Sequence, residues 1–337
     1  MISGPYLLYL GEAADPISVK TARGIAQWRP DACIGQRRLP GCEIDLGLAD
    51  LTYAEAAAAG AKIMVIGDAN AGGVLRTSAH PEIIAALEAG LDVASGLHQR
   101  LKDVAAIQDT AQRLGRTLHD VRDAPEGLKV GTGKPRAGLR LLTVGTDCSV
   151  GKMYTSLALE QEMRARSIPA DFKATGQTGV LISGNGIAID AVVADFISGA
   201  VEQLAPARNV PGWDIIEGQG SLFHPSYAGV SLGLLHGAQP HALVLCHEAG
   251  RPHIRGLEGR PLPGFAECID ANLAAARLTN PTVRAIGVSV NTSRLDPRER
   301  RAFCENLSDT LGLPCQDPLI DGVGQIVDNL IACFEPS

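Results

Sequence analysis

The sequence predicts an α/β protein with two domains, each organised around a parallel sheet. Its 337 residues suit two domains at about 100–200 residues each. Apolar runs typical of buried strands alternate with helical segments in both halves of the chain, a pattern typical of parallel sheets with right-handed crossovers. The composition, with 38 glycines and only 4% aromatic residues, suits close packing of helices on sheets.

The first α/β domain is expected at residues 1–125. Its expected strands are 6–10, 32–35, 61–67 and 91–96. Its expected helices are 17–28, 52–59, a helix opened by Pro81 and closed by Gly90, and 101–114. Thr52 with Glu55 three residues later predicts a capping box at the start of the second helix. Proline at a first helical position and glycine at an end are the usual helix limits.

A segment rich in glycine, proline and charge, residues 126–138, is the expected linker between the domains. Within it, Gly131–Lys134 superficially resembles a phosphate-binding loop. Pro135 follows at once, so no helix is expected after it, and we interpret the segment as linker only.

The second domain is expected at residues 139–337. Its expected strands are 141–144, 170–174, 213–217, 242–246 and 285–291. Its expected helices are 152–166, 187–204, 264–278, 297–312 and 324–333. The same alternation therefore predicts a second parallel sheet.

The sharpest motif is a glycine loop between the first strand and first helix of this domain. It comprises Gly145, Thr146, Asp147, Cys148, Ser149, Val150, Gly151, Lys152 and Met153. Backbone N–H groups and the positive end of a helix converge on an anion in such a loop, and the lysine adds a charge. Two features depart from the common G-x-x-x-x-G-K-[S/T] pattern: five residues separate the glycines, and Met153 replaces the hydroxyl that normally holds Mg²⁺.

Further polar residues follow the expected strands, where ligands of parallel sheets bind. Glu217 could hold a metal, accept a proton or orient an amine, or its carboxylate could simply be fixed by the neighbouring glycine turn. His224 follows in the same loop, with either a proton role or a structural hydrogen bond. Lys173 and the glycine–threonine segment after it suit ligand contact or a bare loop. Asp190 stands in the first turn of an expected helix, where acids are also favourable for structural reasons.

The segment 247–255 places two histidines, one glutamate and two arginines after a strand. His247 and His253 lack a helix to align them, so a metal site is not expected there. Arg251 and Arg255 are better suited to bind a carboxylate or phosphate, because a guanidinium pairs with either in a bidentate manner.

Charge and cysteine usage exclude several classes of protein. A net charge of −7 argues against a general nucleic-acid binder. The eight cysteines form no C-x-x-C pair, which disfavours a zinc ribbon and indicates reduced core thiols. No basic segment leads into a signal-type apolar stretch, and no run approaches a membrane span. We therefore expect a cytoplasmic protein without membrane contact, and its alanine-rich helices make a homo-oligomer plausible.

The motifs resemble known families. Gly145–Lys152, Ile216–Gly218 and Gly287–Asn291 resemble segments of dethiobiotin synthetase and related P-loop proteins. A closer resemblance is to the DgcN family of D-glutamate N-acetyltransferases, through segments 145–154, 174–179, 188–196, 217–222 and 234–237. It covers both domains and implies a Rossmann-like first domain and a P-loop second domain.

The resemblance implies acetyl transfer from acetyl-CoA to the amine of D-glutamate, in D-amino-acid catabolism. Coenzyme A carries phosphates that a glycine loop can hold without Mg²⁺, so no metal is expected. The amine must lose a proton, and we expect Asp190 or Glu217 as the base. Lys173 or nearby backbone N–H groups would stabilise the oxyanion. Contacts to the acidic amino acid are expected from Gln177, Thr178, Gly179, His224, Arg251 and Arg255, in a crevice between the domains.

Two alternatives remain open from the sequence. The first is an ATP-dependent kinase or carboxylate–amine ligase that uses the same loop and binds Mg²⁺ through Asp147 or Glu217. The second is a nucleotide-sensing regulatory protein that uses the loop as a switch. The concentration of titratable residues at the strand ends argues against the second.

Overall fold

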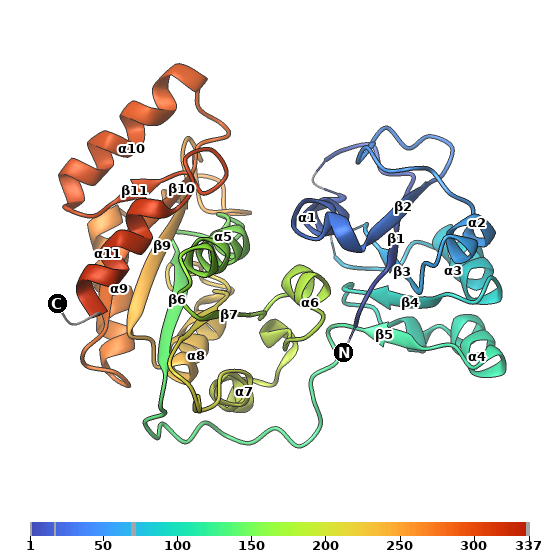
Figure 1. The fold of residues 1–337 in the computed structure, drawn as a ribbon, viewed down its shortest axis with the longest axis horizontal. Helices are drawn as coiled ribbons and strands as arrows, with labels where there is room; N and C mark the ends of the chain where they lie inside the picture. Colours follow the sequence, from blue (N-terminus) through green and yellow to red (C-terminus); the bar gives the residue numbers. More distant parts are fainter. Residues whose placement is uncertain (1, 17, 69–71, 335–337) are drawn as a thin grey trace. The chain divides into compact units, whose positions relative to one another are not determined.

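A computed structural model describes residues 2–16, 18–68 and 72–334. The chain divides into two compact units. The first contains residues 1–124 and 177–188, and the second contains residues 125–176 and 189–337. Each is an α/β unit with an all-parallel sheet, as predicted (Figure 1).

The sheet of the first unit has the strand order β2-β1-β3-β4-β5. Its strands are β1 (Tyr6–Gly11), β2 (Cys33–Arg38), β3 (Ile63–Ile66), β4 (Asp92–Ser95) and β5 (Leu118–Asp120). The central strands β1 and β3 are buried along their whole length, as expected for a parallel sheet covered on both faces. The short edge strand β5 was not predicted, because three residues give no usable periodicity.

Helices cover both faces of this sheet. They are α1 (Lys20–Trp28), α2 (Tyr53–Ala58), α3 (Ala79–Glu88), α4 (Ala105–Leu114) and α6 (Gln177–Ser183). The predicted capping box is confirmed, since Oγ1 of Thr52 accepts from the N–H of Glu55 and the Glu55 carboxylate accepts from the N–H of Thr52 at 2.8 Å. Helix α3 begins two residues before Pro81, which its first turn tolerates because the missing N–H would lack a partner there. Residue 17, in the expected first helix, lies outside the described residues.

Helix α6 was not predicted, and it packs on α1. The hydroxyls of Thr178 and Thr21 are 3.2 Å apart, and the Arg29 guanidinium donates to the carbonyl of Ile182 at 3.0 Å. Residues 177–188 are therefore part of the first unit, whereas the sequence prediction assigned all of 139–337 to the second domain. The order of elements along the chain does not reveal that a segment of the second half packs in the first unit.

The sheet of the second unit has the strand order β11-β10-β9-β6-β8-β7. Its strands are β6 (Leu139–Gly145), β7 (Ala170–Lys173), β8 (Trp213–Ile216), β9 (Ala242–Glu248), β10 (Arg284–Asn291) and β11 (Cys315–Gln316). The pairing of β6 with β9 sets Gly145 opposite Cys246. This register brings the loops after these two strands together at one edge of the sheet.

Helices α5 (Lys152–Ala165) and α11 (Gly324–Phe334) contact each other and the strands, whereas α7 (Ile197–Leu204), α8 (Ala228–Ala238) and α9 (Phe265–Arg277) form a second group (Figure 1). Helix α10 (Pro297–Leu311) packs beside β11. The predicted helix 187–204 is wrong in its first half, which forms two 3₁₀ turns, Ile189–Ala191 and Ala194–Phe196.

Helix α8 was missed because glycines interrupt its sequence. Two of them have a packing reason. A Cβ on Gly233 would lie 2.7 Å from the Ile197 side chain, and one on Gly237 would lie 2.5 Å from the carbonyl oxygen of Ser198. The glycines therefore permit α8 and α7 to approach closely, although glycine disfavours an isolated helix.

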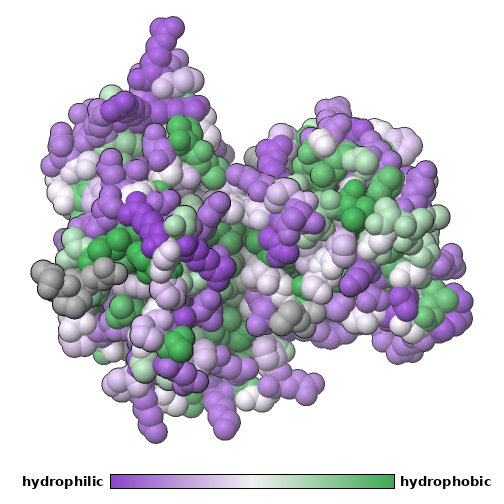
Figure 2. All heavy atoms as spheres, viewed as in Figure 1, coloured by the Kyte–Doolittle hydropathy of each residue, from purple (hydrophilic) through white to green (hydrophobic). Residues whose placement is uncertain are grey.

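Residues 125–138 form no helix or strand before β6. Inside this stretch the N–H groups of Thr132 and Gly133 donate to the carboxylate of Glu202 at 2.9 Å, so the second glycine motif binds an anion of the chain itself. Hydrophilic and hydrophobic residues are mixed on the visible surface of each unit (Figure 2). Among the described residues, no helix is long and apolar enough to cross a membrane.

Candidate active site

The phosphate-binding loop has the predicted strand–loop–helix layout, from the end of β6 to the start of α5. Gly151 has φ +100°, which an L-residue with a side chain rarely adopts. A Cβ on Gly145 would lie 2.9 Å from Nζ of Lys152, so the first glycine makes room for the lysine. Ser149, between them, has φ +55° and occupies the left-handed region without being glycine. The glycines thus serve the loop geometry itself.

Lys152 is buried at the base of this loop, with 7% of its surface exposed. Its Nζ donates to the carbonyl oxygen of Asp147 at 2.9 Å. Burial lowers the pKa of Lys152, while nearby thiols and Asp147 act in the opposite direction. A bound phosphate would place a negative charge beside Nζ of Lys152 and would favour the protonated form of the lysine.

The Asp147 carboxylate is fully buried and organises the loop from inside. Its Oδ2 accepts from Nη1 of Arg251 at 2.6 Å and from the N–H of Arg255 at 2.7 Å, and its Oδ1 accepts from the N–H of Cys148 at 2.7 Å. This carboxylate thus accepts three hydrogen bonds, and replacing the donors by Mg²⁺ would leave the Arg251 guanidinium without its buried partner.

Arg251 holds the loop from the other side. Besides Asp147, it donates to the carbonyl oxygens of Cys148 at 2.7 Å and Ser149 at 2.9 Å, and its Nε donates to Glu248 at 2.6 Å. From the sequence we expected this guanidinium to contact substrate. In the structure its hydrogen bonds go to the loop, and a substrate carboxylate would have to compete with them.

Arg255 is the exposed cation of this edge. Its guanidinium contacts Oγ of Ser149, while its backbone N–H is bound to Asp147. The side chain therefore lies on the phosphate-binding loop with solvent access, so it is better placed than Arg251 to meet an anionic ligand.

Glu217 follows β8 and is 4% exposed. Its Oε2 accepts from the N–H groups of Thr175 at 2.9 Å and Gly176 at 3.0 Å. Burial raises the pKa of Glu217 to about 7, against the opposing effects of these hydrogen bonds and the Lys152 charge. A carboxyl group that titrates near neutral pH is suited to general-base chemistry.

Two glycines allow the backbone to close around this carboxylate. A Cβ on Gly176 would lie 2.9 Å from Oε1 of Glu217, and one on Gly218 would lie 1.7 Å from the carbonyl oxygen of Thr143. The N–H of Gly218 donates to Oγ1 of Thr143 at 2.9 Å, which ties the Glu217 segment to the strand that leads into the loop. Thr175 belongs to the glycine–threonine segment that was expected to contact a ligand, whereas Thr143 was not predicted to belong to the site. The position of Thr143 in the strand that leads into the glycine loop was the available signal.

Asp190 lies in an exposed 3₁₀ turn that belongs to the second unit. Its negative charge contributes to the raised pKa of Glu217, although less than burial does. The structure therefore places both predicted base candidates within electrostatic reach of each other.

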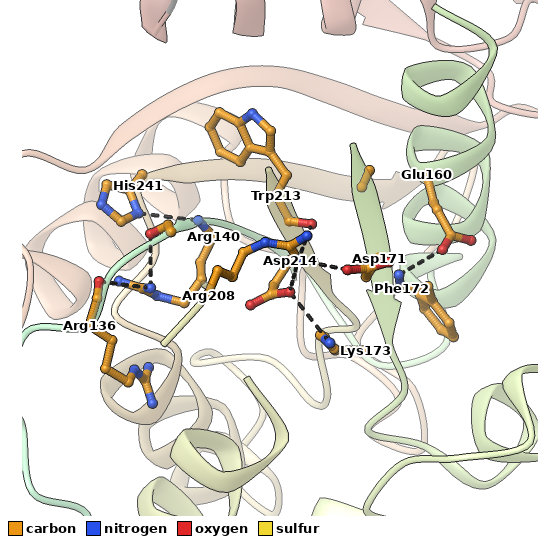
Figure 3. A network of polar contacts seen from close by, with 12 residues as sticks. Arg136, Arg140, Glu160, Asp171, Phe172, Lys173, Arg208, Trp213, Asp214 and His241 are labelled. Atoms are coloured by element: carbon orange, nitrogen blue, oxygen red, sulfur yellow. Dashed lines mark hydrogen bonds and ion pairs between the residues drawn. The ribbon is translucent and has the colours of Figure 1, made fainter. Parts of the chain in front are cut away.

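Lys173 belongs to a different network (Figure 3). Its Nζ lies 3.4 Å from Oδ1 of Asp214, which is 2% exposed on its side chain and also accepts from Arg208 at 2.6 Å. Arg208 in turn pairs with Asp171 at 2.7 Å. The Lys173 ammonium thus has an ion-pair partner in Asp214, while its carbonyl oxygen accepts from the N–H of Glu217 at 3.1 Å.

The predicted substrate contacts Gln177, Thr178 and Gly179 open helix α6 in the first unit. Oε1 of Gln177 accepts from Nε of Arg122 at 3.2 Å, Thr178 faces Thr21, and Gly179 is buried. These residues thus have structural partners in the first unit.

His224 is buried and fixed by two hydrogen bonds. Its Nδ1 accepts from the N–H of Ser226 at 3.2 Å, which leaves the proton on Nε2 to be donated to the carbonyl oxygen of Arg255 at 3.1 Å. Ligand atoms of Asp147, Cys148 and His224 lie within 4.8 Å of one another. Because the nitrogens of His224 and the Asp147 carboxylate are engaged, this cluster does not form a ready metal site.

Two further residues of this edge have structural roles. Oγ1 of Thr155 donates to the carbonyl of Gly151 at 3.1 Å and lies 2.7 Å from Oγ of Ser289, so it does not replace the hydroxyl missing at Met153. His247 lies 3.0 Å from Oγ1 of Thr146, and burial lowers its pKa to about 4, which keeps the ring neutral at physiological pH.

Comparison with known proteins places the chain in a family. Residues 129–327 match the domain of unknown function DUF1611_C, a P-loop domain, and residues 37–124 match DUF1611_N, a Rossmann-like domain. A D-glutamate N-acetyltransferase from Pseudoalteromonas is 51% identical over 98% of this chain and 99% of the relative. One from Tritonibacter scottomollicae is 49% identical over 98% of this chain and 100% of the relative.

A solved structure agrees with this assignment. The crystal structure of a DUF1611 family protein from Anabaena variabilis covers 97% of this chain, and the chain covers 99% of it, with 32% identity and a TM-score of 0.86. The fold, the two matched domains and the full-length relatives agree, and the chain therefore belongs to the DUF1611 family, with a Rossmann-like first domain and a P-loop second domain.

Proposed function

We propose that this protein is a D-glutamate N-acetyltransferase that moves the acetyl group of acetyl-CoA to the amino group of D-glutamate. The observation that carries the proposal is the near full-length identity, 51% and 49%, to two proteins of that name. The second unit supports it with a phosphate-binding loop and, in the same unit, a buried carboxyl group whose pKa is about 7.

The glycine loop binds the phosphates of coenzyme A in this proposal. Backbone N–H groups of the loop and the N-terminus of α5 favour an anion, and Lys152 adds a charge once its bond to Asp147 is exchanged for a phosphate oxygen. Arg251 keeps the loop in shape through Asp147, and Arg255 is an exposed cation whose guanidinium contacts Ser149 of the loop.

Glu217 is the proposed base. In its ionised form it takes a proton from the substrate ammonium, directly or through one water, and the neutral amine then attacks the thioester carbonyl carbon. The new C–N bond forms and the C–S bond breaks. The attacking nitrogen gives up its second proton, the leaving coenzyme A thiolate takes up one proton, and the proton on Glu217 returns to solvent. Asp190 acts on this step through its charge, which raises the pKa of Glu217.

An ATP-dependent kinase or ligase receives less support from this site. Met153 follows the lysine where a hydroxyl would hold Mg²⁺, and the Asp147 carboxylate already accepts from Arg251, Arg255 and Cys148. Phosphate binding that tolerates the absence of Mg²⁺ suits coenzyme A better than ATP.

Two coarser properties follow from the same proposal. All eight cysteines are free thiols, which supports a reducing compartment such as the cytoplasm. We also propose a homo-oligomer on the basis of the alanine-rich helices. Light scattering on the purified protein measures this directly, and a monomeric mass at working concentration contradicts it.

The test of the activity is thiol release from acetyl-CoA without ATP or added metal, with D- and L-amino acids as acceptors. We expect release with D-glutamate, and mass spectrometry should identify N-acetyl-D-glutamate. Glu217→Gln should reduce turnover about 10²–10⁴-fold while retaining acetyl-CoA binding. ATP cleavage in place of thiol release would falsify the proposal in favour of a kinase or ligase.

A further inference from the structure

A second polar cleft lies in the first unit, at the carboxyl ends of β1 and β3. It is lined by Tyr9, Glu12, Ile66, Asp68, Arg76 and Ser78, among others. In the strand order β2-β1-β3-β4-β5, β2 lies on one side of β1 and β3 lies on the other, so the direction of the connections reverses between β1 and β3. Ligands of open parallel sheets bind at such a switch point, outside the carboxyl ends of the strands.

Tyr9 supplies the observation that points to a ligand. The side chain is 3% exposed, and among the described residues its hydroxyl has no hydrogen-bond partner. Burial raises the pKa of Tyr9 above its ordinary value, helped by Glu82, Glu12 and Asp68, so the hydroxyl stays a neutral donor. A Cβ on Gly11 would lie 3.3 Å from this hydroxyl, and the glycine keeps it accessible. Because this side chain lines the cleft, a ligand or water there can accept the hydrogen bond of the hydroxyl.

The charges of the cleft define the ligand. Nε of Arg76 pairs with Oδ2 of Asp68 at 3.0 Å, which holds the guanidinium and leaves its terminal nitrogens for a bidentate carboxylate. Arg76 is 46% exposed on its side chain, so a ligand can reach it. Glu12 is an exposed acid lining the same cleft and offers an acceptor for an ammonium group.

We propose that this cleft binds a small amino acid in its zwitterionic form. The carboxylate pairs with Arg76 and accepts from the Tyr9 hydroxyl, and the ammonium group faces Glu12. The site is distinct in residues from the phosphate-binding loop. Only the choice of glutamate as the probe rests on the proposed acetyltransferase function.

Hydrogen–deuterium exchange on the full chain tests the site, with D- and L-glutamate as probes. We expect glutamate to slow exchange in peptides covering residues 72–82. Tyr9→Phe removes only the hydroxyl. It should raise about tenfold the glutamate concentration that gives the same protection. Arg76→Gln should weaken it further. Arg113→Gln, an exposed arginine on α4, is the matched control and should bind as the unmodified protein does.

Protection confined to peptides around Glu217 and the phosphate-binding loop, with none at residues 72–82, overturns this inference and leaves the acetyltransferase proposal intact. Protection that is equal in the Tyr9→Phe variant and the control also overturns it. Absence of thiol release from acetyl-CoA, with protection at residues 72–82 retained, removes the proposed function and supports the amino-acid site.

Discussion

Nη1 of Arg251 lies 2.6 Å from Oδ2 of Asp147, in an ion pair between two residues that are 104 positions apart. The Asp147 side chain is fully buried and that of Arg251 is 9% exposed. This pair joins the loop after β9 to the phosphate-binding loop after β6. The shape of the anion site therefore depends on a residue outside the motif that defines it.

Removing the Arg251 charge should disturb the loop and the fold together. Arg251→Met leaves Asp147 buried without its partner, and we expect a loss of about 3–5 kcal/mol in the free energy of unfolding. The KM for acetyl-CoA should rise more than kcat falls, because in the proposed function this loop binds the phosphates of coenzyme A. Denaturant unfolding and steady-state kinetics measure the two effects.

Arg294→Met is the matched control for that substitution. Arg294 also pairs with Glu248, at 3.3 Å, but its side chain is 55% exposed. We expect a change in the free energy of unfolding below about 1 kcal/mol. Equal effects of the two substitutions would show that the Asp147 pair does not hold the loop.

Glu217 should make the stability of the protein fall as pH rises. Its native pKa is about 7, above the ordinary value of 4.5 that applies to the unfolded chain. Between these pH values the native state binds more protons, so the stabilisation is complete below pH 4.5 and is lost as pH rises through 7. The magnitude is about 3 kcal/mol at most.

The check is to compare Glu217→Gln with the unmodified protein at pH 5 and pH 8 in denaturant titrations. The amide that replaces the Glu217 carboxyl group has no proton to lose, so the variant should gain stability relative to the unmodified protein on going from pH 5 to pH 8. A constant difference across this range would rule out a native pKa near neutrality.

Asp190→Asn separates the two base candidates. If Glu217 is the base, removing the Asp190 charge should lower the pKa of Glu217 and move the acidic limb of the rate–pH profile to lower pH, with the plateau rate largely retained. Loss of the plateau rate itself, at every pH, would instead identify Asp190 as the base. Asp195→Asn, on the next turn of the chain, is the control for a nearby loss of charge.

Lys173→Met should affect catalysis little. Its ammonium pairs with Asp214, and that carboxylate keeps Arg208 at 2.6 Å (Figure 3). We expect a loss of about 1 kcal/mol or less in the free energy of unfolding and a nearly unchanged kcat. Arg208→Met, which removes the closer partner of Asp214, should destabilise more, by about 3 kcal/mol. A large fall in kcat for Lys173→Met at unchanged stability would restore its role as an oxyanion donor.

The sequence by itself determined the two parallel sheets, the strand–loop–helix layout of the glycine loop and the place of Glu217 directly after a strand. These features depend on local order: an apolar run, a glycine turn and a helix that follow one another fix the loop, and an acid directly after a strand reaches the edge where ligands bind. Helix α8 escaped prediction, because its glycines serve contacts with α7 rather than local helical preference. Two 3₁₀ turns also replace the first half of the helix predicted at 187–204.

Only the tertiary structure decided what the charged side chains bind. The sequence predicts that Arg251 contacts substrate, and in the structure its guanidinium pairs with Asp147. The two residues meet because the register of β9 on β6 sets the loops after these strands side by side. Lys173 turns out to pair with Asp214, and residues 177–188 join the first unit. A charge selects its partner by distance and burial in three dimensions, and neither is encoded in the spacing of residues along the chain.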